Sequence, residues 1–215
     1  MKLYTKNRAR GDFAYGSMMV DGELHATVKS AGVFKLTDKL YIALKHNKRK
    51  NFSDFKNYLG HSQAPTSSAR KYSHDTAHPF NTGKWYVAHN GVLSNEKELR
   101  SLLKKYKDVN EVDSSLIPAL IDHCSKTEKN EAKAICNALS MLKGTFGVWI
   151  INSKNNHVYL ARSGSTLFAD FLTNNFTSVK HNDYKSLEEG ILYFQTVEGL
   201  TSVGSFTPNS PFFVA

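Results

Sequence analysis

Residues 94–142 carry three consecutive apolar stripes with helical spacing, and this helical block lies between two regions with β-strand patterns. The stripes cover residues 99–106, 116–124 and 132–142, where apolar side chains recur every three or four positions. Ser94 or Asn95 fits the cap of the first helix. Pro118 fits only near a first turn, which predicts that the second helix begins near Ser114.

The regions on either side of the helical block have β patterns. Residues 13–20 and 24–29, divided by Asp21-Gly22, predict a hairpin because Asp-Gly favours the positive φ angles of a tight turn. A helix is expected at residues 34–45 and a strand at 58–62. Short strands are expected at residues 146–151, 157–161, 166–171 and 191–195. This order predicts an α+β fold with one core, so residues 1–215 are expected to form a single domain. Residues 196–215 are expected to form an edge strand or a docking tail.

The composition predicts a protein of the cytoplasm. Of the 215 residues, 40% are hydrophobic and 22% are charged, and no apolar run approaches the roughly 18 residues that a membrane span needs. The N-terminus has no apolar segment typical of a secretory signal. The two cysteines, Cys124 and Cys136, lie in helical stripes and fit small core residues of a reducing compartment. No cofactor is expected.

A formal net charge of +9 leaves an acidic partner open. The densest basic run is Lys45-His46-Asn47-Lys48-Arg49-Lys50, which is typical of a solvated helix end or loop. No aromatic recognition motif accompanies it. Binding to nucleic acid or to another acidic surface is therefore the weaker alternative.

The candidate chemistry lies at Asn90-Gly91, which follows the strand-like residues 85–88 and a long polar loop at 64–82. The Asn90 side-chain amide and the Gly91 N–H are two donors able to stabilise the negative charge that develops on a carbonyl oxygen. A simple turn that ends a buried strand is the alternative interpretation. Ser62 has no recognisable base beside it, so no serine nucleophile is predicted.

Histidines are frequent around this region but predict no metal site. His61, His74, His78 and His89, together with Asp75, do not have the spacing of a common zinc motif. No metal ligand is therefore expected.

Eight short segments, in order along the chain, resemble the glutaminase domain of class II glutamine amidotransferases, the N-terminal-nucleophile type. They are Arg10-Gly11 with Gly16, Gly60-His61, Ala77-His78-Pro79-Phe80, His89-Asn90-Gly91, Val112-Asp113-Ser114, Leu142 to Gly147, Ala161-Arg162-Ser163-Gly164 and Leu187-Glu188-Glu189-Gly190. The resemblance implies a four-layer α-β-β-α sandwich in which two antiparallel sheets lie face to face. It also implies glutamine, or a related small molecule, as the ligand.

The resemblance assigns roles to individual residues. Asn90 and Gly91 correspond to the oxyanion hole, and Asp113 to the residue that holds the substrate α-amino group, although a helix cap explains Asp113 equally well. Thr66 lies in the substrate-covering loop. Arg10 corresponds to a residue that braces the chain near the nucleophile. Gln63 stands where the family carries an arginine that binds the substrate α-carboxylate.

The family's nucleophile is a cysteine at the mature N-terminus, and this sequence begins Met1-Lys2. No nucleophile is therefore predicted, and with Gln63 this favours a domain that does not hydrolyse glutamine and has a binding or assembly role. The alternative is an active subunit whose cysteine-bearing strand lies outside this sequence and which supplies ammonia to a partner synthase.

Overall fold

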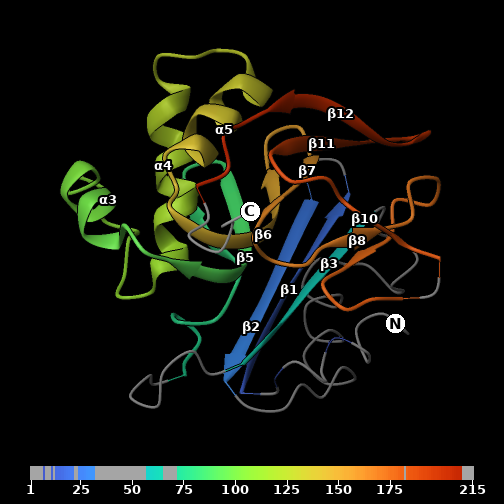
Figure 1. Ribbon diagram of the computed structural model, residues 1–215. Helices are drawn as coiled ribbons and strands as arrows, with labels where there is room; N and C mark the ends of the chain where they lie inside the picture. The colour runs from blue at the N-terminus through green and yellow to red at the C-terminus, as the bar shows by residue number, and fades with distance from the viewer. Residues whose placement is uncertain are drawn as a thin grey trace. The chain divides into compact units, whose positions relative to one another are not determined.

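The computed structural model describes residues 7, 11, 13–21, 24–31, 57–64, 72–181 and 183–209. The chain divides into an N-terminal unit, residues 1–79 with 153–156, and a C-terminal unit, residues 80–152 with 157–215. Each unit contains antiparallel β-sheet, and Figure 1 labels the strands and helices.

The N-terminal unit contains a three-stranded sheet in the order β2-β1-β3. Its strands are β1 (Ala14–Asp21), β2 (Leu24–Ala31) and β3 (Asn57–Gln63). The central strand β1 is buried on both faces, because Met18 and Met19 point to opposite sides and neither is exposed. The predicted hairpin and the third strand are confirmed. The helix predicted at residues 34–45 and the basic run at 45–50 lie outside the described residues.

The C-terminal unit contains a six-stranded sheet in the order β12-β11-β7-β6-β5-β4. Its strands are β4 (Phe80–Thr82), β5 (Trp85–Leu93), β6 (Gly144–Asn152), β7 (His157–Ser163), β11 (Ile191–Thr196) and β12 (Gly199–Ser205). A smaller sheet has the order β10-β8-β9. Its strands are β8 (Phe168–Ala169), β9 (Phe176–Thr177) and β10 (Lys185–Ser186).

The described helices of the C-terminal unit form the predicted central block. They are α3 (Glu96–Leu102), the 3₁₀ helix η3 (Asp113–Ser115), α4 (Leu116–Ser125) and α5 (Glu131–Ser140). Helices α4 and α5 lie side by side (Figure 1). Leu120 of α4 and Ile135 of α5 belong to the same buried cluster as Trp85 of β5, so helices and sheet share one core.

Glu131 fixes the first turn of α5 to the sheet. Its carboxylate accepts hydrogen bonds from His157 Nδ1 and from the Tyr159 hydroxyl, both at 3.0 Å, and from the Asn152 amide. Lys84 forms an ion pair with the same carboxylate at 3.5 Å. Burial raises the pKa of Glu131, but these hydrogen bonds and positive charges outweigh it and leave the pKa below its ordinary value. The carboxylate is therefore held in its ionised form.

The helical block differs from the prediction at its boundaries. Asn95 occupies the N-cap position of α3, yet its side chain bonds the Met141 carbonyl oxygen and the Lys143 N–H instead of an α3 N–H. Asn95 therefore joins α3 to the segment before β6. The helix predicted to begin near Ser114 is confirmed, since η3 leads directly into α4.

Two predictions for irregular and extended segments are partly wrong. The loop expected to reach residue 82 ends earlier, because Phe80 to Thr82 pair with β5 as β4. The strand expected at residues 166–171 is reduced to β8. Asp170 ends it by accepting hydrogen bonds from the N–H groups of Leu172 and Thr173, which closes a turn.

Residues 196–215 were expected to form an edge strand or a docking tail, and within this range β12 forms one edge of the six-stranded sheet. The assignment of residues 1–215 to a single domain stays a prediction. No helix in the described part of the chain is long and apolar enough to cross a membrane.

Both cysteines are core residues, as predicted. Cys124 of α4 and Cys136 of α5 are free thiols, each 8% exposed, and both belong to the apolar cluster between helices and sheet. Burial raises the pKa of each thiol. Neither has the exposure or the stabilised thiolate that a nucleophile needs.

Candidate active site

The residues His89, Asn90 and Gly91 lie inside β5, where the sequence suggested a turn. Strand β5 continues to Leu93 because β6 pairs with it along its whole length, with Asn90 opposite Gly147 and Gly91 opposite Phe146. On its other side, β5 is paired only at residues 85–87, by β4. Among the described strands, none covers the edge of β5 from residue 88 to residue 93. We refer to this segment as the open edge of β5.

Gly91 has a backbone conformation that requires glycine. Its φ angle is +149°, and a β-carbon at this position would lie 2.0 Å from the Thr145 carbonyl oxygen of β6. The positive φ angle and the nearby Thr145 carbonyl oxygen both exclude a side chain at this position. The strand is therefore locally distorted at the candidate oxyanion donor.

The direction of the Gly91 N–H follows from its neighbours in β5. The N–H groups of Val92 and Ser94 point to the β6 side, where they donate to the Thr145 hydroxyl and the Lys143 carbonyl. The Leu93 N–H points the other way and donates to Asp113 at 3.0 Å. Successive N–H groups of a regular strand alternate in direction, and this rule predicts the Gly91 N–H on the same side as that of Leu93, along the open edge.

His89 joins β5 to the start of the helical block. Its ring is 3% exposed, with Nε2 3.1 Å from the Thr145 carbonyl oxygen and Nδ1 2.9 Å from the Ser114 hydroxyl. A carbonyl oxygen only accepts, so Nε2 carries the proton, and Nδ1 of the neutral ring shares the single Ser114 hydroxyl proton with Asp113 Oδ1, which lies 3.2 Å from the same hydroxyl. Burial lowers the pKa of His89, an effect that the negative charge of Asp113 and the bond to Thr145 partly offset. His89 is therefore a neutral structural link.

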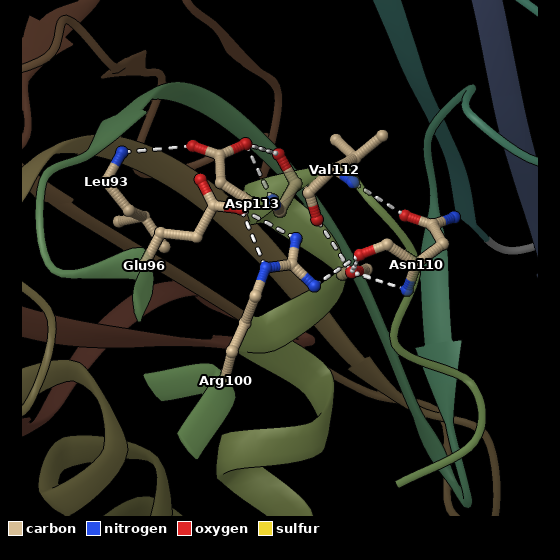
Figure 2. Close-up of polar contacts among 8 residues, drawn as sticks. Leu93, Glu96, Arg100, Asn110, Val112 and Asp113 are labelled. Carbon is tan, nitrogen blue, oxygen red and sulfur yellow. Dashed lines mark hydrogen bonds and ion pairs between the residues drawn. The ribbon is translucent and has the colours of Figure 1, made fainter. Parts of the chain in front are cut away.

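Asp113 is held at the open edge by backbone donors. Oδ2 accepts from the Leu93 N–H at 3.0 Å, and Oδ1 accepts from the Ser114 N–H at 2.7 Å (Figure 2). Asp113 is the first residue of η3, and the N-cap position is Val112, so Asp113 is not a side-chain N-cap. The Ser114 hydroxyl is a third donor, 3.2 Å from Oδ1. An ionised carboxylate has about four acceptor sites, so these three contacts still leave capacity for a further donor.

A polar network fixes the segment that leads into Asp113. The Arg100 guanidinium of α3 donates to the Asn110 carbonyl oxygen at 2.6 Å and to Glu96 at 2.8 Å. The Asn110 side chain accepts from the Val112 N–H at 2.9 Å. Figure 2 shows these contacts running from α3 to the residue before Asp113. The position of Asp113 is therefore set by α3, by β5 and by its own helical turn.

The Asn90 side chain has a partner that the sequence did not indicate. Its Nδ2 donates to the Ser165 hydroxyl at 3.1 Å. The segment containing Ser165 is held by Arg162 and Glu189, an ion pair at 3.0 Å that is largely buried. Asn90 and Ser165 are too far apart in the sequence for a local pattern to predict their hydrogen bond. Arg162 and Glu189 both occur in segments that carried the family resemblance.

The structure brings together some of the predicted site residues. Asn90, Gly91 and Asp113 share one end of β5 in the C-terminal unit. Gln63 lies at the end of β3 in the N-terminal unit and is 4% exposed. Thr66 and Arg10 lie outside the described residues. The binding roles expected for all of these residues stay predictions.

A protein-family model matches the part of the chain that contains Asn90, Gly91 and Asp113. Residues 69–169 match the family model described as "Glutamine amidotransferase domain". The chain is 35% identical over 98 residues to the glutamine–fructose-6-phosphate aminotransferase (isomerizing) of Haemophilus influenzae, covering 44% of this chain and 16% of that enzyme. It is 31% identical over 138 residues to the Methanococcus maripaludis enzyme of the same name, covering 57% and 23%. The match thus spans less than a quarter of either relative.

Solved structures share the fold. Glutamine phosphoribosylpyrophosphate amidotransferase from B. subtilis matches with a TM-score of 0.67 and 20% identity, over 94% of this chain and 45% of that chain. A glutamine aminotransferase class-II domain protein from Silicibacter pomeroyi matches with a TM-score of 0.58 and 15% identity, over 90% and 92%. Likeness at these identities concerns the fold alone. It confirms the predicted α+β class, the N-terminal-nucleophile hydrolase type with antiparallel sheets.

Proposed function

This chain carries a class II glutamine amidotransferase domain, and from that premise we propose that it binds glutamine along the open edge of β5 without hydrolysing it through a thiol of its own. The side-chain carbonyl of the ligand meets Asn90 and Gly91, and its α-amino group meets Asp113. The resulting role is binding or assembly.

The observation that carries this proposal is the hydrogen bond from the Leu93 N–H to Asp113, two residues beyond Gly91 in β5. The alternation of strand N–H groups predicts the Gly91 donor on the same side of β5. Two strand residues span about 7 Å. Four covalent bonds of about 1.5 Å separate the amine nitrogen from the amide carbon of glutamine. An extended glutamine therefore has the length to reach from the Asp113 carboxylate to the Gly91 donor.

The thiols of the chain support the second half of the proposal. A cysteine nucleophile works as a thiolate, and it needs access to the substrate carbonyl. Cys124 and Cys136 are both nearly buried in the apolar cluster, and burial raises the pKa of both. Attack on an amide through either one would require the core to open.

The test uses the 215-residue chain in two parallel measurements. Isothermal titration calorimetry with L-glutamine measures binding, and D-glutamine serves as the matched control for the Asp113 contact. A coupled assay measures ammonia release from L-glutamine. Binding of the L-isomer with ammonia release equal to that of a protein-free reaction is the expected result. Absence of binding, or ammonia and glutamate formed at an enzyme-like rate, would contradict the proposal.

A second candidate function is an active glutaminase whose cysteine comes from sequence outside residues 1–215. The geometry that favours it is the fixed arrangement of Asn90 and Gly91, which an enzyme needs and a purely structural domain does not. The ammonia would then go to a partner synthase. Intact mass of the native product, followed by the ammonia assay before and after alkylation with iodoacetamide, separates the two functions. A native product with no additional cysteine would exclude the second.

A further inference from the structure

We infer that Ser165 is a positioning residue for the Asn90 side-chain amide, and that the Arg162–Glu189 ion pair acts through the Ser163–Ser165 segment to place it. This inference rests on the proposed function, because it concerns how the amide is presented to the ligand carbonyl. The sequence assigned a role to none of these three residues.

The Asn90 amide must be held in one orientation if its N–H is to meet a ligand carbonyl. An asparagine side chain carries two N–H bonds on Nδ2 and an acceptor oxygen, and rotation of the amide exchanges them. One Nδ2 hydrogen is engaged by the Ser165 hydroxyl at 3.1 Å. The other hydrogen on the same nitrogen then has a fixed direction. A ligand carbonyl then meets a donor whose orientation is already set, so less side-chain entropy of Asn90 is lost on binding.

The backbone around Ser165 is itself held by two side chains, Arg162 and Glu189. Arg162 on β7 donates through one terminal nitrogen to the Ser165 carbonyl oxygen at 2.9 Å, and its Nε donates to the Leu187 carbonyl oxygen at 2.6 Å. Glu189 pairs with the same guanidinium at 3.0 Å, and its second oxygen accepts from the Gly164 N–H at 3.2 Å. The guanidinium and the carboxylate therefore clamp the backbone at Ser165 and Gly164.

Burial strengthens this clamp. The side chains of Arg162 and Glu189 are 18% and 19% exposed, so water screens their attraction less than at an open surface. Gly164, between Ser163 and Ser165, has a φ angle of +66°, which lets the backbone turn sharply towards the Asn90 side chain. A surface loop without such contacts would not hold a hydroxyl at a constant distance from β5.

The experiment compares the wild type with Ser165→Ala, Ser165→Thr and Ser202→Ala. Ser165→Thr keeps the hydroxyl, and Ser202 is an exposed serine of β12 that serves as the matched control. The first readout is the pair of Asn90 side-chain amide resonances in the ligand-free protein, assigned by their loss in Asn90→Asp. The second is the dissociation constant for L-glutamine, measured by calorimetry.

We expect Ser165→Ala to displace both Asn90 amide resonances and to weaken glutamine binding by about 2- to 10-fold, the range of one lost hydrogen bond. Ser165→Thr restores both readouts, and Ser202→Ala changes neither. Unmoved resonances in Ser165→Ala, or moved resonances with unchanged glutamine affinity, would overturn the inference. If the wild type binds no glutamine, the proposed function fails, and the ligand-free resonances alone decide whether Ser165 holds the amide.

Discussion

The Asp113 carboxylate accepts the Leu93 N–H at 3.0 Å, and this bond, with the one between His89 and Ser114, ties the first turn of the η3–α4 segment to β5 near Gly91. It fixes a negative charge beside a strand edge that also carries the Gly91 donor. The anionic and the donor parts of the candidate site are therefore held by one rigid connection.

Replacement of Asp113 by asparagine tests this connection. Asp113→Asn turns one acceptor into a donor, which opposes either the Leu93 or the Ser114 N–H, so the free energy of unfolding should fall by about 1–3 kcal/mol. The charge-assisted contact to the ligand amine is lost as well, so glutamine affinity should fall by about 10- to 150-fold. Urea denaturation and calorimetry measure the two effects. Asp108→Asn, at an exposed position of the same unit, is the control.

Introduction of a methyl group at Gly91 tests the distortion of β5. Gly91→Ala places a β-carbon 2.0 Å from the Thr145 carbonyl oxygen at a φ of +149°, so it should lower the free energy of unfolding by more than about 2 kcal/mol. Gly147→Ala on the paired strand is the control, since its β-carbon would approach nothing closer than 3.2 Å. Equal costs for both variants in urea denaturation would show that β5 is regular at Gly91.

The buried state of His89 predicts a pH dependence of stability. Its pKa in the folded protein lies below the value of about 6.5 in an unfolded chain. Below pH of about 6.5 the unfolded chain takes up a proton that the folded protein does not, so the free energy of unfolding decreases as the pH falls and is fully retained above that pH.

Urea denaturation between pH 7.5 and pH 5.5 measures this loss. His89→Gln should be less stable than the wild type throughout and should show a smaller decrease over this interval. His74→Gln, at an exposed position of the N-terminal unit, is the control. A wild-type stability that rises on acidification would contradict the assignment of a neutral His89.

Removal of Glu131 tests the attachment of α5 to the sheet. Glu131→Ala leaves the donors of Asn152, His157 and Tyr159 without their shared acceptor, so the free energy of unfolding should fall by about 1–3 kcal/mol. Glu98→Ala is the matched control. Glu98 also forms an ion pair, with Lys143, but both side chains are more than half exposed, so its loss should cost less than about 1 kcal/mol.

The sequence predicted the type of each long element but not where several of them end. The helical block was found because burial on one face of a helix gives the apolar residues a regular spacing. Strands β6 and β7 are buried at most positions and were recognised as short apolar runs. Strand β4 escaped detection because it has three residues, too few to show alternation. The end of β8 depends on the Asp170 turn, whose hydrogen bonds appear only once the backbone is placed.

Only the site residues that belong to recognisable sequence motifs could be predicted. Asn90 and Gly91 were named from two adjacent donors and Asp113 from the family resemblance, and the structure places all three around one strand. Ser165 was not foreseen, because it lies 75 positions from its partner Asn90. The turn suggested at Asn90-Gly91 was wrong for a related reason: pairing with β6 keeps the chain extended through a residue that in isolation favours a bend.

The brevity of β4 has a consequence for handling the protein. No described strand pairs with β5 at residues 88–93 on the side away from β6, so the backbone groups there that Asp113 does not hold are able to pair with a strand from a second chain. Concentrated samples are therefore expected to self-associate through this segment, and an amino-acid ligand should disperse them, which light scattering would register.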